Sequence, residues 1–258
     1  MPPHIRPQAT VDQGLFLSDL GILDREIAEM CGVAVKTVRR WRRLYQRRGV
    51  IRGQHERTCP GCHDRSLDPA AYSLLLGAYL GDGHIIQNKR GVYLLSLFQD
   101  ARYVGLIREW RAALESVKGG GSSHLANKPG CTAIQSYWMH WPCLFPQHGP
   151  GRKHDRSITL EPWQKAIVEA DPRPFLRGLF HSDGCRITNW TVRQLRAGPK
   201  RYEYPRYFFS NKSADIIGLC TWALDLLDIA WRQPRYDAIS VARREAVAAL
   251  DEFVGPKF

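Results

Sequence analysis

The stretch Leu74–Ile85, LLLGAYLGDGHI, recurs in altered form at Phe175–Ile187, FLRGLFHSDGCRI. When the copies are aligned on Asp82 and Asp183, the matched positions are Gly77 with Gly178, Tyr79 with Phe180, Gly81 with Ser182 and Gly83 with Gly184. A strand-like apolar run and then an amphipathic helical pattern follow each copy. The chain is therefore predicted to contain two pseudo-symmetric halves, each built on a helix–strand–strand–helix unit, that share a core.

Small residues recur four positions apart in each motif, so each pair lies on one face of its predicted helix. Such faces let two helix backbones approach closely. Asp82 and Asp183 fall at the last turn of their helices, and a glycine follows each as a stop residue. Because two carboxylates brought together repel each other, they favour a divalent cation, which prefers oxygen ligands. The alternative is a pair of ordinary helix-ending turns, but the duplication favours a paired metal site.

Both stretches resemble the LAGLIDADG motif of homing endonucleases, here present twice in one chain, and the resemblance covers about residues 69–255. It implies an α+β fold of two αββαββα halves, with motif helices at their interface and saddle-like antiparallel sheets that straddle duplex DNA. In that family the terminal acidic residues hold divalent metal over the scissile phosphates. Asp82 and Asp183 would then bind Mg²⁺ or Mn²⁺. The sequence departs from the motif at several positions, including Arg177 where an apolar residue is usual, but it keeps both carboxylates.

The endonuclease interpretation gives catalytic roles to further polar residues. Gln99 and Asn211 occupy matched strand ends and are predicted to orient water, although amides that stabilise a strand-end turn are the simpler interpretation. A basic side chain should offset charge on the pentavalent phosphate, and Lys212 and Arg186 are the candidates. The predicted function is site-specific hydrolysis of double-stranded DNA. A non-cleaving transcription regulator on the same fold is the first alternative, and a maturase-like RNA-binding protein is the second.

The composition agrees with a nucleic-acid partner. The chain has 258 residues and a formal charge of +12, which favours nucleic acid or an anionic surface. No apolar run approaches the length of a membrane span, no signal-peptide pattern opens the sequence, and the seven cysteines do not form a disulfide framework. We therefore expect a cytoplasmic protein, nucleoid-associated if bacterial, that binds double-stranded DNA as a monomer with internal pseudo-two-fold symmetry.

Residues 1–54 are predicted to form a separate helix-turn-helix domain. In Asp24–Trp41, Ala28 is the small residue of the first helix, Gly32 is the turn glycine and Val38 is an apolar position of the second helix. The pattern is similar to the resolvase- and transposase-type helix-turn-helix. The predicted DNA-contacting residues on the second helix are Lys36, Thr37, Arg39, Arg40 and Arg43. The alternative is a structural helical pair with a solvated basic face.

Residues 55–68 are predicted to be a linker with a zinc knuckle at Cys59-Pro-Gly-Cys62. Two thiolates at this spacing can chelate one tetrahedral ion, but a structural zinc site needs four ligands. The candidates for the remaining ligands are His55, His63, Cys131, His140, Cys143 and His148. A turn with free thiols is the alternative.

The two repeats divide the rest of the chain into a first half at 69–148, a linker at 149–172 and a second half at 173–258. The second repeat is eleven residues longer between its first two strands. This insertion, Arg193–Arg206, predicts an extended basic hairpin with tyrosines, suited to contacts with bases and phosphates, and a solvated loop is the alternative. The predicted DNA contacts outside the first domain are Lys89, Arg90, Arg152, Lys153, Arg186, Arg193, Arg196, Lys200 and Arg201.

Overall fold

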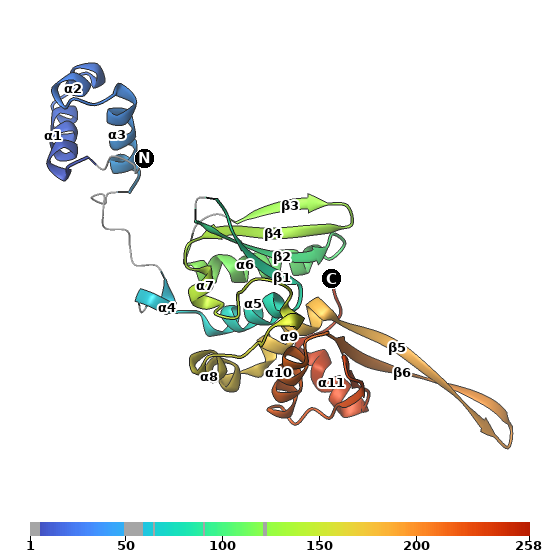
Figure 1. The fold of residues 1–258 in the computed structure, drawn as a ribbon. Helices are drawn as coiled ribbons and strands as arrows, with labels where there is room; N and C mark the ends of the chain where they lie inside the picture. The colour runs from blue at the N-terminus through green and yellow to red at the C-terminus, as the bar shows by residue number, and fades with distance from the viewer. Residues whose placement is uncertain (1–5, 49–58, 64, 90, 121–122) are drawn as a thin grey trace. The chain divides into compact units, whose positions relative to one another are not determined.

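A computed structural model describes residues 6–48, 59–63, 65–89, 91–120 and 123–258, with the backbone alone at 43–48 and 63. The chain divides into two compact units, residues 1–57 and 58–258. Their helices and strands are labelled in Figure 1. Within the described residues, no helix combines the length and the apolar character that crossing a membrane requires.

The described residues of the first unit form three helices, which are α1 (Gln8–Asp19), α2 (Asp24–Met30) and α3 (Val35–Arg48). Its small core includes Ile27, Ala28, Val38 and Trp41. Gly14 allows α1 to approach this core, because a Cβ there would lie 2.8 Å from the Trp41 ring. The turn between α2 and α3 contains Gly32 at φ +61°, a left-handed conformation that favours glycine. The predicted roles of the small, turn and apolar residues are thus confirmed.

The second unit contains the two predicted αββαββα halves. The elements of the first half are α5 (Pro69–Asp82), β1 (Gly83–Gln87), β2 (Tyr93–Asp100), α6 (Val104–Lys118), β3 (His124–Lys128), β4 (Cys131–Trp138) and α7 (Trp141–Leu144). The elements of the second half are α9 (Pro172–Asp183), β5 (Gly184–Leu195), β6 (Gly198–Ser210), α10 (Ala214–Asp225), β7 (Arg232–Arg235), β8 (Ala238–Val241) and α11 (Arg244–Phe253). The short elements outside this repeat are α4 (Pro60–His63), η1 (Lys153–Asp155) and α8 (Pro162–Ala170).

The two sheets have the same antiparallel topology. The strand order is β1-β2-β4-β3 in the first sheet and β5-β6-β8-β7 in the second. One continuous core runs through both halves, from Leu95 and Ile134 of the first sheet to Phe209 and Ile239 of the second. The predicted α+β architecture of two saddle-like halves is therefore confirmed, and the internal symmetry extends to the order of the strands.

The motif helices α5 and α9 pack against each other at the centre of this unit (Figure 1). Each begins with an aspartate N-cap followed by proline, Asp68 for α5 and Asp171 for α9, which fixes the first turn. Gly77 and Gly178 meet at the crossing. A Cβ on Gly77 would lie 2.9 Å from the backbone nitrogen of Leu179, and the backbone there leaves no room for it. The predicted face of small residues is thus the helix interface.

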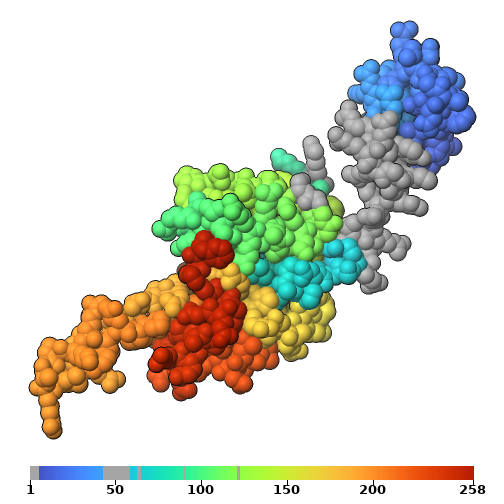
Figure 2. All heavy atoms as spheres, turned by 180° about the vertical axis from the view of Figure 1, so that it is seen from behind, coloured from blue at the N-terminus to red at the C-terminus, as the bar shows by residue number. Residues whose placement is uncertain are grey.

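The hairpin β5–β6 is far longer than its counterpart β1–β2. Its strands have 12 and 13 residues, against 5 and 8 for β1 and β2. A tight turn joins them, with Gly198 at φ +106°. The hairpin projects from the second half as an arm that leaves most of its side chains exposed, as Figures 1 and 2 show. The predicted extended basic hairpin is therefore present.

Candidate functional site at the ends of the motif helices

Packing of α5 against α9 brings Asp82 and Asp183 together at the adjacent carboxyl ends of the two helices. A Cβ on Gly81 would lie 3.2 Å from Oδ2 of Asp183, so the second carboxylate reaches the residue that precedes the first. Asp82 is exposed and Asp183 is half-buried, but protein atoms crowd both carboxyl groups. Desolvation and then the charge of Asp183 raise the pKa of Asp82 to about 6. Desolvation also raises the pKa of Asp183.

Lys153 of η1 covers the end of the first motif helix. Its Nζ donates hydrogen bonds to the carbonyl oxygens of Tyr79, Leu80 and Gly81, at 2.5, 2.9 and 2.6 Å. The last carbonyls of a helix lack partners within the helix, although that of Tyr79 also accepts from the backbone N–H of Gly83. A cation at this end also interacts favourably with the helix dipole. Burial lowers the pKa of Lys153 to about 8, although the nearby carboxylates of Asp183 and Asp82 act in the opposite direction.

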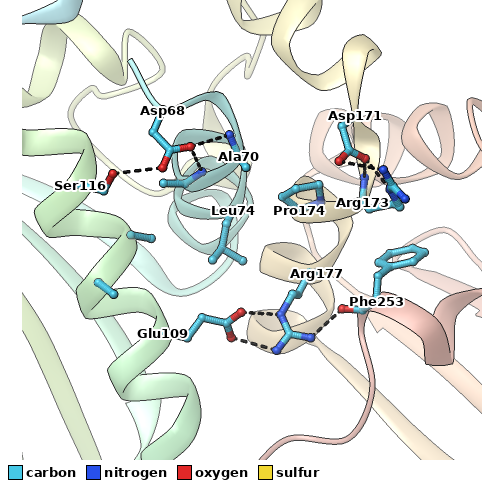
Figure 3. A pocket seen from close by; sticks show the side chains of 13 residues that line it. Asp68, Ala70, Leu74, Glu109, Ser116, Asp171, Arg173, Pro174, Arg177 and Phe253 are labelled. Carbon is cyan, nitrogen blue, oxygen red and sulfur yellow. Dashed lines mark hydrogen bonds and ion pairs between the residues drawn. The ribbon is translucent and has the colours of Figure 1, made fainter. Parts of the chain in front are cut away.

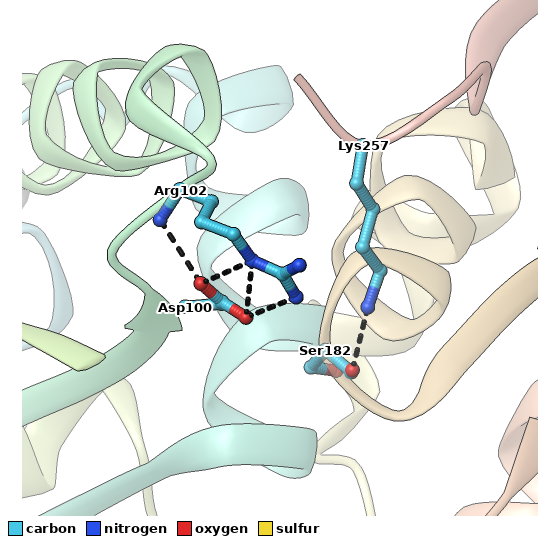
Figure 4. Close-up of polar contacts among 4 residues, drawn as sticks. All are labelled: Asp100, Arg102, Ser182 and Lys257. Atoms are coloured by element: carbon cyan, nitrogen blue, oxygen red, sulfur yellow. Dashed lines mark hydrogen bonds and ion pairs between the residues drawn. The ribbon is translucent and has the colours of Figure 1, made fainter. Parts of the chain in front are cut away.

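Lys257 takes the corresponding place at the end of the second motif helix. Its Nζ donates to the carbonyl oxygen of Ser182 at 3.2 Å, and Figure 4 shows it beside the Asp100–Arg102 ion pair. Desolvation lowers the pKa of Lys257, while the carboxylate of Asp82 raises it. The sequence analysis assigned Lys153 to DNA contact and did not select Lys257. Neither lysine lies in a motif, so no local pattern marks them, and only their position in the fold does.

The two predicted water-orienting amides lie at the site but make different contacts. Asn211 donates to Oδ2 of Asp183 at 2.6 Å and so holds that carboxylate. Gln99, which is buried, donates instead to the carbonyl oxygen of His181 at 2.8 Å, across the interface between the halves. Both amides thus contact α9, which departs from the pseudo-symmetry of the halves, and only Asn211 touches a carboxylate.

The two predicted phosphate-neutralising residues differ in their surroundings. Lys212 is exposed and directly follows the amide that holds Asp183. Arg186 makes a two-pronged ion pair with Asp251 of α11, at 2.7 and 2.8 Å, and its guanidinium lies over the Tyr207 ring. Tyr207 belongs to the core, so Arg186 lies on the helix-covered side of the sheet with its charge already paired. Its role at the phosphate stays a prediction.

The basic residues predicted to contact DNA are mostly exposed. Those exposed in the second unit are Lys89, Arg152, Arg186, Arg193, Arg196, Lys200 and Arg201, and those exposed in the first unit are Lys36, Arg39 and Arg40. Besides Arg186, two of them have ion-pair partners, since Arg39 binds Asp24 at 3.3 Å and Arg201 binds Glu203 at 2.6 Å. Thr37 is half-buried. Arg90 and the side chain of Arg43 lie outside the described residues.

Arg193 and Lys200 occupy directly opposite positions of the β5–β6 ladder. Both cations lie over the ring of Tyr202, at 5.9 and 5.3 Å from its centroid. Like charges placed opposite each other on neighbouring strands repel. An anion bound between them would offset this repulsion, so the arm carries a surface suited to phosphate.

The cysteines of the predicted zinc knuckle lie away from the carboxylate site, where α4 meets α7. Cys59 and Cys62 come together with His140 and Cys143 in one cluster. Of the other predicted ligands, Cys131 and His148 are not part of this cluster. His55 and the side chain of His63 lie outside the described residues.

A cavity of about 560 Å³ lies at the opposite ends of the motif helices, between their N-termini and α6. Figure 3 shows Asp171 paired with Arg173, and Arg177 bridging Glu109 and the carbonyl oxygen of Phe253. Asp68 instead accepts from the hydroxyl of Ser116 and from backbone N–H groups of α5. The pairing of Arg177 accounts for an arginine in place of the usual apolar motif residue. Arg177 ties α9 to α6 and to the end of α11, and it is remote in the fold from the carboxylates.

Comparisons with known proteins yield a family model and several solved structures. Residues 13–52 match the model of a homeodomain-like domain, which confirms the helix-turn-helix domain predicted at the N-terminus. A comparison with curated protein sequences finds no match to this chain.

The chain is similar to three structures of LAGLIDADG proteins with DNA. The I-SmaMI homing endonuclease bound to cleaved DNA shares 12% identity over 74% of this chain and 84% of that chain, with a TM-score of 0.45. The meganuclease I-AabMI bound to uncleaved DNA shares 13% identity over 70% and 82%, with a TM-score of 0.43. The I-LtrWI homing endonuclease bound to target DNA shares 8% identity over 72% and 84%, with a TM-score of 0.46.

Proposed function

We propose that this protein is a site-specific DNA endonuclease in which Asp82 and Asp183 bind Mg²⁺ or Mn²⁺ at the junction of the two halves. The observation that carries the proposal is the convergence of two carboxylates, one from each copy of the motif, at one helix junction. Desolvation and mutual repulsion raise the pKa of Asp82 to about 6, so binding of a divalent cation would relieve an unfavourable arrangement of charge. The donors are carboxylate oxygens, which fit Mg²⁺ and Mn²⁺.

A divalent ion at such a site supplies an activated water and stabilises the leaving oxygen. The chain's own residues position these groups. Asn211 fixes the orientation of the Asp183 carboxylate through its 2.6 Å hydrogen bond. Lys153 and Lys257 place two cations at the ends of the motif helices, where negative charge accumulates on the phosphate during hydrolysis. Their lowered pKa values favour proton donation near neutral pH over that of an ordinary lysine.

Exposed basic side chains support duplex DNA as the substrate. The open face of the β5–β6 arm carries the repelling pair Arg193 and Lys200. Lys36 and Arg40 on α3 of the homeodomain-like unit would add a second contact surface. Because residues between the two units link them covalently, binding by one unit raises the effective concentration of DNA at the other.

The test is a cleavage assay on a randomised duplex library with Mg²⁺ or Mn²⁺. Asp82→Asn combined with Asp183→Asn should abolish cleavage while duplex binding persists. The matched control is Asp228→Asn, an exposed aspartate at φ 53°, a conformation that asparagine also tolerates, and it should cleave like the parent. Sequence-selective binding by the parent without cleavage under either metal would overturn the enzyme proposal and leave a DNA-binding regulator.

A further inference from the structure

Two segments far apart in the sequence converge to place four metal-ligand side chains together. Cys59 directly precedes the four-residue helix α4, and Cys62 lies within it. His140 directly precedes α7, and Cys143 lies within it. The three sulfur atoms and one imidazole nitrogen all lie within 4.8 Å of one another. The cluster shares no residue with the carboxylate site, and the nuclease proposal makes no use of it.

The separations match those of a tetrahedral zinc site. With Zn–S near 2.3 Å and Zn–N near 2.0 Å, tetrahedral geometry places a sulfur and a nitrogen ligand about 3.5 Å apart. Here Sγ of Cys62 lies 3.3 Å from Nδ1 of His140, and Sγ of Cys143 lies 3.7 Å from the same atom. We propose that Cys59, Cys62, His140 and Cys143 bind one structural Zn²⁺ ion.

The surroundings of the cluster hold its ligands in place. Gly61 allows the cysteine turn to approach α7, because a Cβ there would lie 3.3 Å from the carbonyl oxygen of Cys143. The Trp138 ring packs edge-on against the His140 ring, with centroids 5.4 Å apart. Trp141 is fully buried, and its indole N–H donates to the carbonyl oxygen of Ser136 at 2.9 Å. The imidazole is thus oriented by packing, as expected of a metal ligand whose position is set before the ion binds.

The ligand set also selects the metal. Three thiolates and one imidazole suit Zn²⁺ and disfavour Mg²⁺, which requires oxygen ligands. All four positions of a tetrahedral ion are filled by the protein, which is the arrangement of a structural site and leaves no position for a substrate. Each metal would therefore occupy its own site without competition.

The ion would cross-link the beginning of the second unit to its core. On one side, α7 is anchored by the carbonyl oxygen of Leu144, which accepts hydrogen bonds from the buried side chains of Tyr72 and Gln164, at 2.5 and 3.2 Å. On the other side, α4 has only four residues and cannot persist as an isolated helix. Zinc would thus fix residues 59–62 to the body of the unit and set the point from which the connection to the homeodomain-like unit departs.

The first experiment measures zinc bound to the purified full-length chain after exhaustive dialysis against metal-free buffer. The parent should retain one Zn²⁺ per chain, and Cys143→Ser should lose it. The matched control is Cys131→Ser, which removes a half-buried cysteine from the same half but outside the cluster and should retain zinc. Equal zinc content in both variants would overturn the assignment of the ligands.

Two further measurements on the parent keep the test independent of how Cys143→Ser folds. Replacement of zinc by Co²⁺ should give the intense visible absorption of a tetrahedral ion with thiolate-to-metal charge transfer. Removal of zinc by a chelator should speed tryptic cleavage after Arg65, whose guanidinium donates to the carbonyl oxygen of Val117 while the segment is docked. A parent chain that binds neither metal, or that contains a Cys59–Cys62 disulfide by mass spectrometry, would overturn the zinc site.

Discussion

At the scale of single residues, the second motif helix, α9, contains a buried ionisable group that the fold keeps neutral. His181 is 1% exposed, and its Nε2 has no hydrogen-bond partner among the described residues. Desolvation, followed by the charges of Arg177 and Lys257, lowers the pKa of His181 to about 3. This buried histidine therefore makes the stability of the fold sensitive to acid.

We predict that His181 weakens the fold at low pH. Its folded-state pKa of about 3 lies below the ordinary value of 6.5, so the unfolded chain takes up a proton that the folded chain cannot. The free energy of unfolding is then lost as pH falls from 6.5 towards 3, by about 1.4 kcal/mol per pH unit. The pKa values of Asp82 and Asp183 are raised, so protonation of these two carboxylates increases the free energy of unfolding as pH falls.

Urea unfolding of metal-free protein between pH 7 and pH 4 measures this effect. His181→Gln should lose less stability on acidification than the parent, because glutamine does not titrate. His124→Gln, at an exposed position, serves as the control and should follow the parent. Parallel curves for the parent and His181→Gln would contradict the prediction.

Arg177 is the second residue whose environment decides its role. Its guanidinium binds Glu109 at 2.6 Å and the carbonyl oxygens of Phe253 and Val254 at 2.6 Å each, with 20% of its side chain exposed. Arg177→Met would leave a carboxylate and two carbonyls unpaired, so we expect a loss of about 2–3 kcal/mol in the free energy of unfolding.

Arg173→Met provides the matched control one turn earlier in the same helix. Arg173 pairs with Asp171, but its side chain is 60% exposed, so its loss should change stability by no more than about 0.5 kcal/mol. Equal effects of the two substitutions in urea denaturation would show that the interface position of Arg177 contributes nothing beyond a surface ion pair.

At the scale of elements, the crossing of α5 and α9 depends on the absence of side chains. A Cβ on Gly178 would lie 2.7 Å from the backbone nitrogen of Ala78 and would overlap the Leu74 carbonyl oxygen. Neither backbone atom can move without separating the helices. We predict that Gly178→Ala costs about 3 kcal/mol or more in the free energy of unfolding.

Gly218 of α10 supplies the control for this substitution. No atom lies within 4 Å of a Cβ built there, so Gly218→Ala should stabilise the fold by up to about 1 kcal/mol through helix propensity. Thermal or urea unfolding of both variants gives the comparison. If Gly178→Ala were as well tolerated as Gly218→Ala, close helix packing would not be what brings the carboxylates together.

At the scale of the whole molecule, DNA affinity should depend on where the basic residues lie and not on their total number. Arg193→Gln with Lys200→Gln removes two opposed cations from the β5–β6 arm. Because each phosphate contact contributes about 0.9 to the slope of log affinity against log salt, the slope should fall by about 2 in magnitude.

The control changes the net charge equally on other elements. Arg108→Gln with Arg244→Gln removes two exposed arginines from α6 and α11 and should leave the salt slope unchanged. Binding to a short duplex, measured by fluorescence anisotropy at several salt concentrations, distinguishes the pairs. An identical slope for both double variants would mean that the arm does not contact phosphates.

Much of the fold follows from local sequence. The repeated motif predicted both halves, the interface helices and the convergence of Asp82 and Asp183. These features are readable because the spacing of the small residues and the position of the stop glycine both depend only on local helix geometry. The helix-turn-helix and the long hairpin were predicted for the same reason, since helix periodicity, turn glycines and an insertion length are all readable along the chain.

Tertiary structure alone decided which distant residues complete each site. Lys257 reaches the end of α9 from the chain's last residues, and His140 and Cys143 meet the cysteine turn from about eighty residues away. It also placed Arg186 in an ion pair with Asp251 of α11. The physical reason is that motifs are set by contacts between near neighbours in sequence, whereas charge pairing and metal-ligand clusters arise where packing brings separate elements together.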